Sequence, residues 1–202
     1  MTIVGEITPK RIAELRARTG AGMMDCKRAL AEAGGDLDKA AEILRARGSA
    51  KADQRAGRTA SEGLIEAYVH FNGKVGVLVE LNCETDFVAR TEGFRQLAKD
   101  VALHVASARP IALRIEDVPA DVVEREKRIY EAQVAAEKKP AHVKAKIVEG
   151  RIKQFYEESV LLEQKFVKDD SRTVGDLIKQ VAATTGENVT LRRFVRFELG
   201  GS

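Results

Sequence analysis

The stretch NCETDFVARTEGF, residues 82–94, holds the most unusual side chains for a binding or catalytic role. An acidic and an aromatic residue, Asp86 and Phe87, follow each other where a predicted β-strand gives way to a helix. The carboxylate of Asp86 could cap that helix. Phe87 falls in the first helical turn, where an aromatic ring either packs into the core or is presented to a partner. The residues alone leave both interpretations open.

The sequence lacks the motifs of the common catalytic and cofactor sites. Neither phosphate-binding pattern, G-x-x-x-x-G-K-[ST] or G-x-G-x-x-G after a strand, occurs. His70, His104 and His142 lie in three different predicted elements and form no H-E-x-x-H motif. Cys26 and Cys83 are too few for a disulfide framework and too isolated for a metal site. We therefore expect a binding or regulatory protein that is not an enzyme and uses no cofactor or metal.

The composition indicates a folded protein without a dedicated nucleic-acid surface. Its 202 residues are 44% hydrophobic and 32% charged, which suits one or two domains with a buried core. The 34 basic and 31 acidic residues are interspersed, so no one-sided basic field is expected. The N-terminus has no signal-peptide stretch, and no run of about 18 apolar residues could span a membrane. We expect a cytoplasmic protein that binds neither membranes nor nucleic acid.

Hydrophobic periodicity predicts a bundle of three short amphipathic helices within residues 1–48. Thr8 and Pro9 form a helix start, with a capping hydroxyl before a proline at the first helical position. Glycines then mark the helix ends. The first helix is expected from Pro9 to Thr19–Gly20, the second from Gly22 to Gly34–Gly35, and the third from Asp36 to Gly48.

Residues 49–62 are small and charged, which is typical of a linker that can be partly helical. Residues 63–202 are expected to form an α+β core domain. An alternating run at 65–71 and a return strand at 74–82 flank Asn72-Gly73, which predicts a hairpin with a two-residue turn. A final strand from Val189 to Leu199, with its apolar residues on one face, would complete a small three-stranded antiparallel sheet packed by helices.

Two helical regions complete the predicted core domain. Phe87, Phe94 and Leu97 begin an apolar stripe that predicts one helix ending before Pro110. At about 121–158 the chain is highly charged with thin apolar seams, and Lys138-Lys139-Pro140 interrupts it, which predicts an inserted antiparallel helical hairpin of coiled-coil type. Its basic residues could meet phosphates, but acidic residues lie among them, as is usual on a solvated helix face. An irregular piece and a helix at 173–185 follow.

Two long motifs, LRARTGAGMMDCKRAL (15–30) and NCETDFVARTEGF (82–94), resemble bacterial elongation factor Ts. The stretches VEGRIKQFYEE (148–158) and GENVTLRRFVRFELG (186–200) are similar to the same family, so the resemblance covers nearly the whole chain in order. It implies a guanine nucleotide exchange factor of translation elongation that binds elongation factor Tu and promotes release of its GDP.

The resemblance also implies which residues contact the partner. One segment matches the part of such factors that disturbs the magnesium and phosphate site of elongation factor Tu, with an aromatic ring as the wedge. A second set matches positions of the N-terminal bundle that face the partner's GTPase domain. The first set is Thr85, Asp86, Phe87 and Val88, and the second is Arg16, Met23, Met24 and Lys27.

Two of these implied assignments are open to alternatives. Met23 shares a helical face with Cys26 and Leu30, which favours Met24 as the outward methionine of the pair. His70 is similar to a histidine in the second core repeat of longer members, but it could equally be an ordinary exposed strand histidine.

Longer members have two core repeats, each with a hairpin, whereas this chain shows only one hairpin and matches the short form of the family. A homodimer that binds two molecules of elongation factor Tu would restore the missing surface. Two other readings stay open. The three-helix bundle resembles ubiquitin-associated domains and could serve a general protein-interaction module, and the charged hairpin could bind RNA of the translation apparatus.

Overall fold

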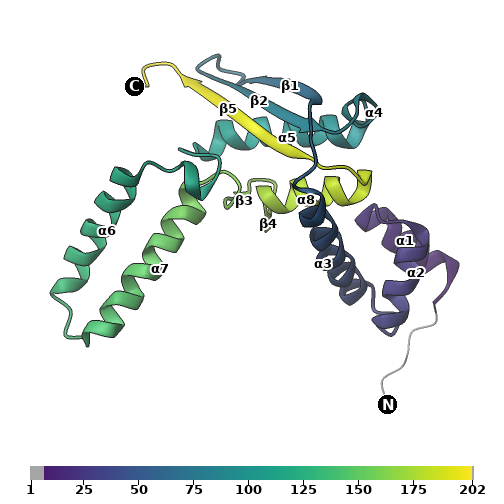
Figure 1. Ribbon diagram of the computed structural model, residues 1–202, viewed down its shortest axis with the longest axis horizontal. Helices are drawn as coiled ribbons and strands as arrows, with labels where there is room; N and C mark the ends of the chain where they lie inside the picture. The colour runs from purple at the N-terminus through teal and green to yellow at the C-terminus, as the bar shows by residue number, and fades with distance from the viewer. Residues whose placement is uncertain (1–6, 202) are drawn as a thin grey trace. The chain divides into compact units, whose positions relative to one another are not determined.

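The computed structural model describes residues 7–201 and confirms the predicted α+β class (Figure 1). A three-stranded sheet is accompanied by α-helices and by a second sheet of two short strands. The helices are α1 (Pro9–Thr19), α2 (Met23–Glu32), α3 (Leu37–Arg55), α4 (Asp86–Ala89), α5 (Glu92–Ala108), α6 (Ala120–Ala135), α7 (Ala141–Ser159) and α8 (Val174–Thr185), and the strands are β1 (Glu62–Val69), β2 (Val75–Cys83), β3 (Lys165–Phe166), β4 (Asp169–Thr173) and β5 (Thr190–Glu198).

The described residues divide into two compact units, and both units draw on the N-terminal and C-terminal halves of the chain. Unit one comprises 7–64, Glu80–Leu97 and Asp176–Arg192, and unit two comprises Ile65–Val79, Ala98–Gly175 and 193–201. The sequence-based division into an N-terminal domain (1–48), a linker (49–62) and a core domain (63–202) remains a prediction about which parts fold independently.

Within unit one, α1, α2 and α3 form the predicted bundle. The Thr8 hydroxyl accepts a hydrogen bond from the backbone N–H of Arg11, Pro9 occupies the first turn, and Gly20 ends α1 in the left-handed conformation at φ 69°. Asp36 caps α3 by accepting from two backbone N–H groups. The apolar stripes meet in a core of Leu15, Cys26, Ala29, Leu30, Ala40 and Leu44.

The third helix does not end at Gly48, as the sequence suggested, but continues to Arg55. Ala52 is buried in this extension and gives it an apolar anchor. A Cβ on Gly48 would lie 3.0 Å from the Cβ of Ala183 on α8, so the glycine permits close packing here instead of ending the helix. Residues 49–55 therefore belong to α3, which leaves 56–61 between the helix and β1.

The larger sheet has the strand order β1-β2-β5 and is antiparallel, as predicted. The backbone N–H of Leu199 donates to the carbonyl of Lys74, and Arg192 pairs with Glu80, so β5 runs opposite to β2. The hairpin turn between β1 and β2 is wider than expected. Only Gly73 has a positive φ, of 67°, because the Asn72 side chain instead accepts a hydrogen bond from the backbone N–H of Lys74.

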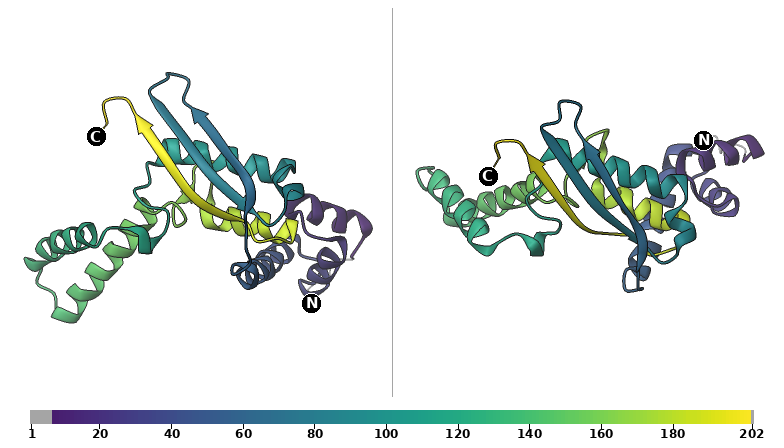
Figure 2. Two further views of the ribbon diagram at one scale, coloured as in Figure 1. Left: turned by 45° about the horizontal axis from the view of Figure 1, so that its top comes forward. Right: turned by 90° about the horizontal axis from the view of Figure 1, so that it is seen from above.

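The two faces of this sheet differ in exposure. Val77, Val79 and Leu81 of β2 are buried, whereas Leu78 between them is 44% exposed. Figure 2 shows the three strands from two further directions. In β5 the predicted single apolar face is divided, since Leu191 is buried but Val195 and Phe197 are exposed. We call the exposed apolar side chains of the sheet in unit two the outer sheet face: Ile65, Val69, Leu78, Val195 and Phe197.

The helix predicted from Phe87 to about residue 109 is in fact two helices. The four-residue α4 ends at Ala89, and α5 begins at Glu92. The Thr91 hydroxyl makes this break, because it donates to the carbonyl of Val88 and accepts from the backbone N–H of Phe94. Phe94 is fully buried and starts the apolar stripe of α5. Phe87 does not belong to that stripe.

In unit two, α6 and α7 form the predicted antiparallel hairpin with Pro140 at the start of α7 (Figure 1). Val134 and Val148 are buried between the helices, whereas Ile129, another apolar residue of α6, is 42% exposed. The irregular piece before α8 contains a second small sheet, β3-β4, that the sequence did not reveal. No helix among residues 7–201 has the length and apolar character needed to cross a membrane.

A buried polar cluster holds this part of unit two together. His104 of α5 is 1% exposed, and its Nδ1 accepts a hydrogen bond from the backbone N–H of Val167 at 3.2 Å. Its Nε2 therefore carries the proton and donates to Oε1 of Gln164 at 3.0 Å. The Gln164 amide in turn donates to the carbonyl of Glu158, near the end of α7. Burial lowers the pKa of His104, so the ring is held neutral.

Candidate functional site

Residues 85–88, which we call the junction segment, leave the end of β2 and form the first turn of α4. Phe87 is 79% exposed and projects from a helix of only four residues. Val88 is 9% exposed and points into the protein, so it anchors the turn. The interpretation of Phe87 as a core residue is wrong: the structure presents its ring to solvent.

Thr85, not Asp86, caps α4. The backbone of Thr85 is extended, and its hydroxyl accepts from the backbone N–H of Val88 at 3.4 Å. Asp86 occupies the first helical position and pairs with Arg90 one turn later at 2.7 Å. A carboxylate there also suits the helix N-terminus electrostatically. The junction segment therefore presents an exposed aromatic ring beside a half-exposed carboxylate.

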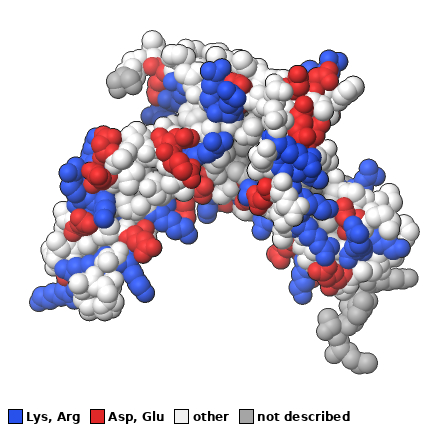
Figure 3. Space-filling view, viewed as in Figure 1, with Lys and Arg blue, Asp and Glu red and all other residues white. Residues whose placement is uncertain are grey.

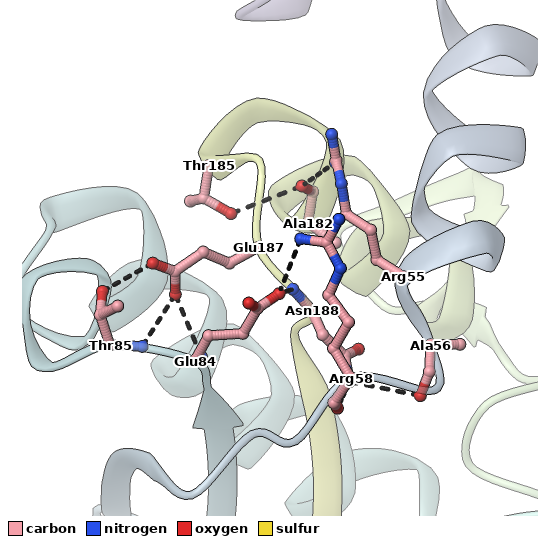
Figure 4. Close-up of polar contacts among 9 residues, drawn as sticks. All are labelled: Arg55, Ala56, Arg58, Glu84, Thr85, Ala182, Thr185, Glu187 and Asn188. Carbon is pink, nitrogen blue, oxygen red and sulfur yellow. Dashed lines mark hydrogen bonds and ion pairs between the residues drawn. The ribbon is translucent and has the colours of Figure 1, made fainter.

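A network of carboxylates behind the junction segment was not predicted (Figure 4). Glu187, in the loop between α8 and β5, accepts from the backbone N–H groups of Glu84 and Thr85, each at 3.0 Å, and from the Thr85 hydroxyl at 2.6 Å. In the opposite direction, the Glu84 carboxylate accepts a hydrogen bond from the backbone N–H of Asn188 at 2.6 Å. These groups are more than 100 positions apart in the chain, so no local sequence pattern marks their contact.

Cys83 lies directly beneath the junction segment and is fully buried. Its Sγ–H donates to the carbonyl of Thr85 at 3.1 Å. Burial, and then the nearby Glu187 carboxylate, raise the pKa of the Cys83 thiol to about 11. A thiol with so high a pKa is a poor nucleophile at neutral pH, so this cysteine is a packing residue and not a reactive group.

The N-terminal candidate residues lie on the surface of the bundle. Arg16 on α1 and Lys27 on α2 are exposed. Met24, which helical spacing favoured as the outward methionine, is 65% exposed, and Met23 is 55% exposed as well. Met23 is the first residue of α2 and lies beyond the packed part of the stripe formed by Cys26 and Leu30. Both methionines offer flexible apolar surface to a partner.

His70 belongs to unit two, whereas the junction segment and the bundle belong to unit one. It stands at the start of the hairpin turn and is half-buried, with its Nδ1 2.9 Å from the Tyr68 hydroxyl. Its ring lies 4.4 Å from the Phe71 ring, which is 92% exposed. The histidine is thus held by its neighbours and is not an isolated exposed strand residue.

Charges of both signs are mixed on the surface of α6 and α7. Figure 3 shows Lys and Arg interspersed with Asp and Glu on the visible face of α6 and α7. Acidic and basic residues one turn apart form ion pairs along these helices, such as Arg125 with Asp121 and Lys153 with Glu157. Among the described residues, no three His, Cys, Asp or Glu side chains are grouped so that they could hold a metal ion.

Comparison with known proteins identifies the family. Residues 39–201 match the family model described as "Elongation factor TS". The chain is 56% identical to "Elongation factor Ts" of Carboxydothermus hydrogenoformans over 96% of its own length and 89% of that protein. It is 55% identical to the protein of the same name from Desulforamulus reducens, over 98% and 91% of the two chains. With the one from Thermotoga maritima it shares 53% identity over 96% and 97%. The chain belongs to the elongation factor Ts family.

Proposed function

We propose that this protein is the guanine nucleotide exchange factor for elongation factor Tu in translation elongation. The observation that supports this most directly is the exposed Phe87 ring on a rigidly capped strand-to-helix junction, in a chain of this family. A large aromatic side chain that is 79% exposed has no role in the core of its own chain. It is available to enter a partner.

The proposed mechanism is a wedge at the partner's metal site. Bound GDP is held by a magnesium ion and by backbone donors around its phosphates. Insertion of the Phe87 ring would displace the groups that position the ion, and the adjacent Asp86 carboxylate would accept hydrogen bonds that those groups had made. The factor binds the empty partner more tightly than the nucleotide-bound partner, and by linkage it lowers the affinity for GDP by the same factor.

A second contact surface on the N-terminal bundle would supply affinity. Arg16, Met23, Met24 and Lys27 are exposed there, and a mixed apolar and basic surface suits a protein partner. We assign this surface to binding and the junction segment to nucleotide release. His70, together with the exposed Phe71 ring, is a further candidate contact.

We further propose that the protein acts as a homodimer in a 2:2 complex with elongation factor Tu. The outer sheet face exposes five apolar side chains on a single small sheet, which is unusual for a monomer in water. Packing of two such faces about a twofold axis would bury them. A dimer would also provide the two core regions that longer members of the family carry in one chain.

Release of a fluorescent GDP analogue from elongation factor Tu tests the exchange activity. Catalytic amounts of this protein should accelerate release, and the purified protein alone should hydrolyse no GTP. Unchanged release at micromolar factor would overturn the proposal. The RNA-binding alternative is tested in parallel by measuring RNA affinity against salt concentration, which should show no specific complex and no steep salt dependence.

A further inference from the structure

A loop at residues 186–188 is hydrogen-bonded to the backbone that leads into the junction segment. Gly186 ends α8 in the left-handed conformation, at φ 78°, and so directs the following residue away from the helix axis. The carboxylate of Glu187 then accepts hydrogen bonds from Glu84 and Thr85, which lie more than 100 positions earlier in the chain. A half-buried carboxylate that accepts three hydrogen bonds is held in one geometry.

The Glu187 carboxylate controls both the backbone and the cap of α4. Its Oε2 accepts hydrogen bonds from the backbone N–H groups of Glu84 and Thr85, the last two residues before the helix. Its Oε1 accepts a hydrogen bond from the Thr85 hydroxyl, and the lone pairs of the Thr85 Oγ then remain available to accept from the backbone N–H of Val88. The cap of a four-residue helix thus depends on a side chain from another element.

The loop that carries Glu187 makes further hydrogen bonds through Asn188. Glu84 accepts from the backbone N–H of Asn188, and its carboxylate also pairs with Arg58 at 3.5 Å. Asn188 is 8% exposed, and its amide donates to the carbonyls of Ala56 and Arg58, just beyond α3. Figure 4 shows these three chain segments meeting around the two carboxylates.

We propose that Glu187 is the positioning residue of the junction segment and sets the direction in which Asp86 and Phe87 are presented. This inference rests on the proposed exchange function and adds a residue to it. A wedge acts only if its ring is rigidly aimed, because a displacement of about 1 Å in a working group can cost about a hundredfold in rate. Four residues of helix cannot supply that rigidity alone.

The test compares Glu187→Gln with Glu187→Ala. The glutamine keeps the size and one acceptor oxygen but replaces the other oxygen with an amide that cannot accept a hydrogen bond. Either the two backbone N–H groups or the Thr85 O–H then loses its acceptor. Alanine removes all three hydrogen bonds. Asp169→Asn is the matched control, because Asp169 also accepts from a backbone N–H and a hydroxyl, those of Ser171, but lies on β4.

Two measurements separate the inference from the function on which it rests. The first is amide hydrogen exchange of Glu84, Thr85 and Val88 in the free protein, which should become about tenfold faster in Glu187→Ala while the amides of α5 stay protected. The second is the limiting rate of GDP release from elongation factor Tu at saturating factor. It should fall about tenfold or more in both variants with a less than about threefold change in the half-saturating concentration, and stay normal in Asp169→Asn.

Each contrary outcome has its own meaning. Faster amide exchange with a normal limiting rate would show that Glu187 holds the backbone without positioning the wedge, and would overturn the inference but not the exchange function. Unchanged amide protection would overturn the inference at its structural step. A wild-type protein that does not accelerate GDP release would overturn the proposed function and the inference with it, whatever the amides show.

Discussion

At the scale of single residues, the contrast between Phe87 and Phe94 separates function from folding. The two rings lie seven positions apart, yet Phe87 is 79% exposed and Phe94 is fully buried. Truncation of a buried phenylalanine costs about 3–5 kcal/mol of stability, whereas an exposed substitution usually changes it by about 0.5 kcal/mol. The two positions therefore give opposite predictions for the same chemical change.

We expect Phe87→Ala to leave the free energy of unfolding in urea nearly unchanged but to slow GDP release at saturating factor by about tenfold or more, equivalent to at least about 1.4 kcal/mol in the barrier. Phe94→Ala should lose about 3–5 kcal/mol of stability and keep a normal exchange rate per folded molecule. A Phe87→Ala protein that is destabilised but exchanges normally would refute the wedge.

His104 gives a prediction about pH. Burial lowers the pKa of its ring in the folded protein, so the unfolded chain takes up a proton at a higher pH than the folded chain does. The stabilising contribution is present above the ordinary histidine pKa of about 6.5 and is lost as pH falls below it. Unfolding in urea between pH 7.5 and 5 should show this loss in the wild type and in His142→Gln, whose histidine is exposed. A His104→Gln variant that keeps the same acid dependence would contradict the assignment.

At the scale of elements, glycines inside helices have different roles according to their surroundings. Gly150 in α7 has nothing within 4 Å of the place where a Cβ would lie, whereas a Cβ on Gly48 in α3 would meet Ala183 at 3.0 Å. The first glycine only weakens its helix. The second also allows two helices to approach closely.

We expect Gly150→Ala to raise the free energy of unfolding by about 0.5–1 kcal/mol, because alanine has the higher helix propensity and meets no neighbour. In Gly48→Ala the same gain is offset by crowding at Ala183, so stability should stay level or fall. Urea midpoints at constant m-value measure both. Equal stabilisation by the two changes would show that α3 and α8 are not packed as described.

At the scale of the whole molecule, the outer sheet face raises the question of assembly. Five exposed apolar side chains on one small sheet form a surface that association would remove from water. The small net charge of +3 offers little electrostatic resistance to self-association. The homodimer proposed above would use this face.

Sedimentation equilibrium should give a mass of about twice the 22.1 kDa of one chain. Phe197→Glu, at a 68% exposed apolar position of β5, should shift the mass to that of the monomer, because dimerisation would then bury an unpaired charge. Ile129→Glu on α6, another exposed apolar position, is the control and should leave the dimer intact. A wild-type monomer across the micromolar range that is fully active would refute the dimer.

The sequence by itself determined the local features of this protein. The Thr8 and Asp36 caps, the left-handed Gly20 and the proline at the start of α7 each act within a few residues, so residue types and spacing were enough to predict them. Apolar periodicity likewise predicted the bundle core and the α6–α7 hairpin. Long sequence motifs were enough to indicate the family, because recognising them does not require knowledge of how their residues pack.

Only the tertiary structure decided which side chains are buried and which distant groups meet. Phe87 could have continued the stripe of α5 until the break at Thr91 placed it outside that stripe. Gly48 looked like a helix end because its packing against Ala183 depends on a helix far away in the chain. The contacts of Glu187 with Thr85 span 102 positions. Such contacts form because polar groups that become buried on folding need hydrogen-bond partners. The periodicity of the sequence does not indicate which distant group will be the partner.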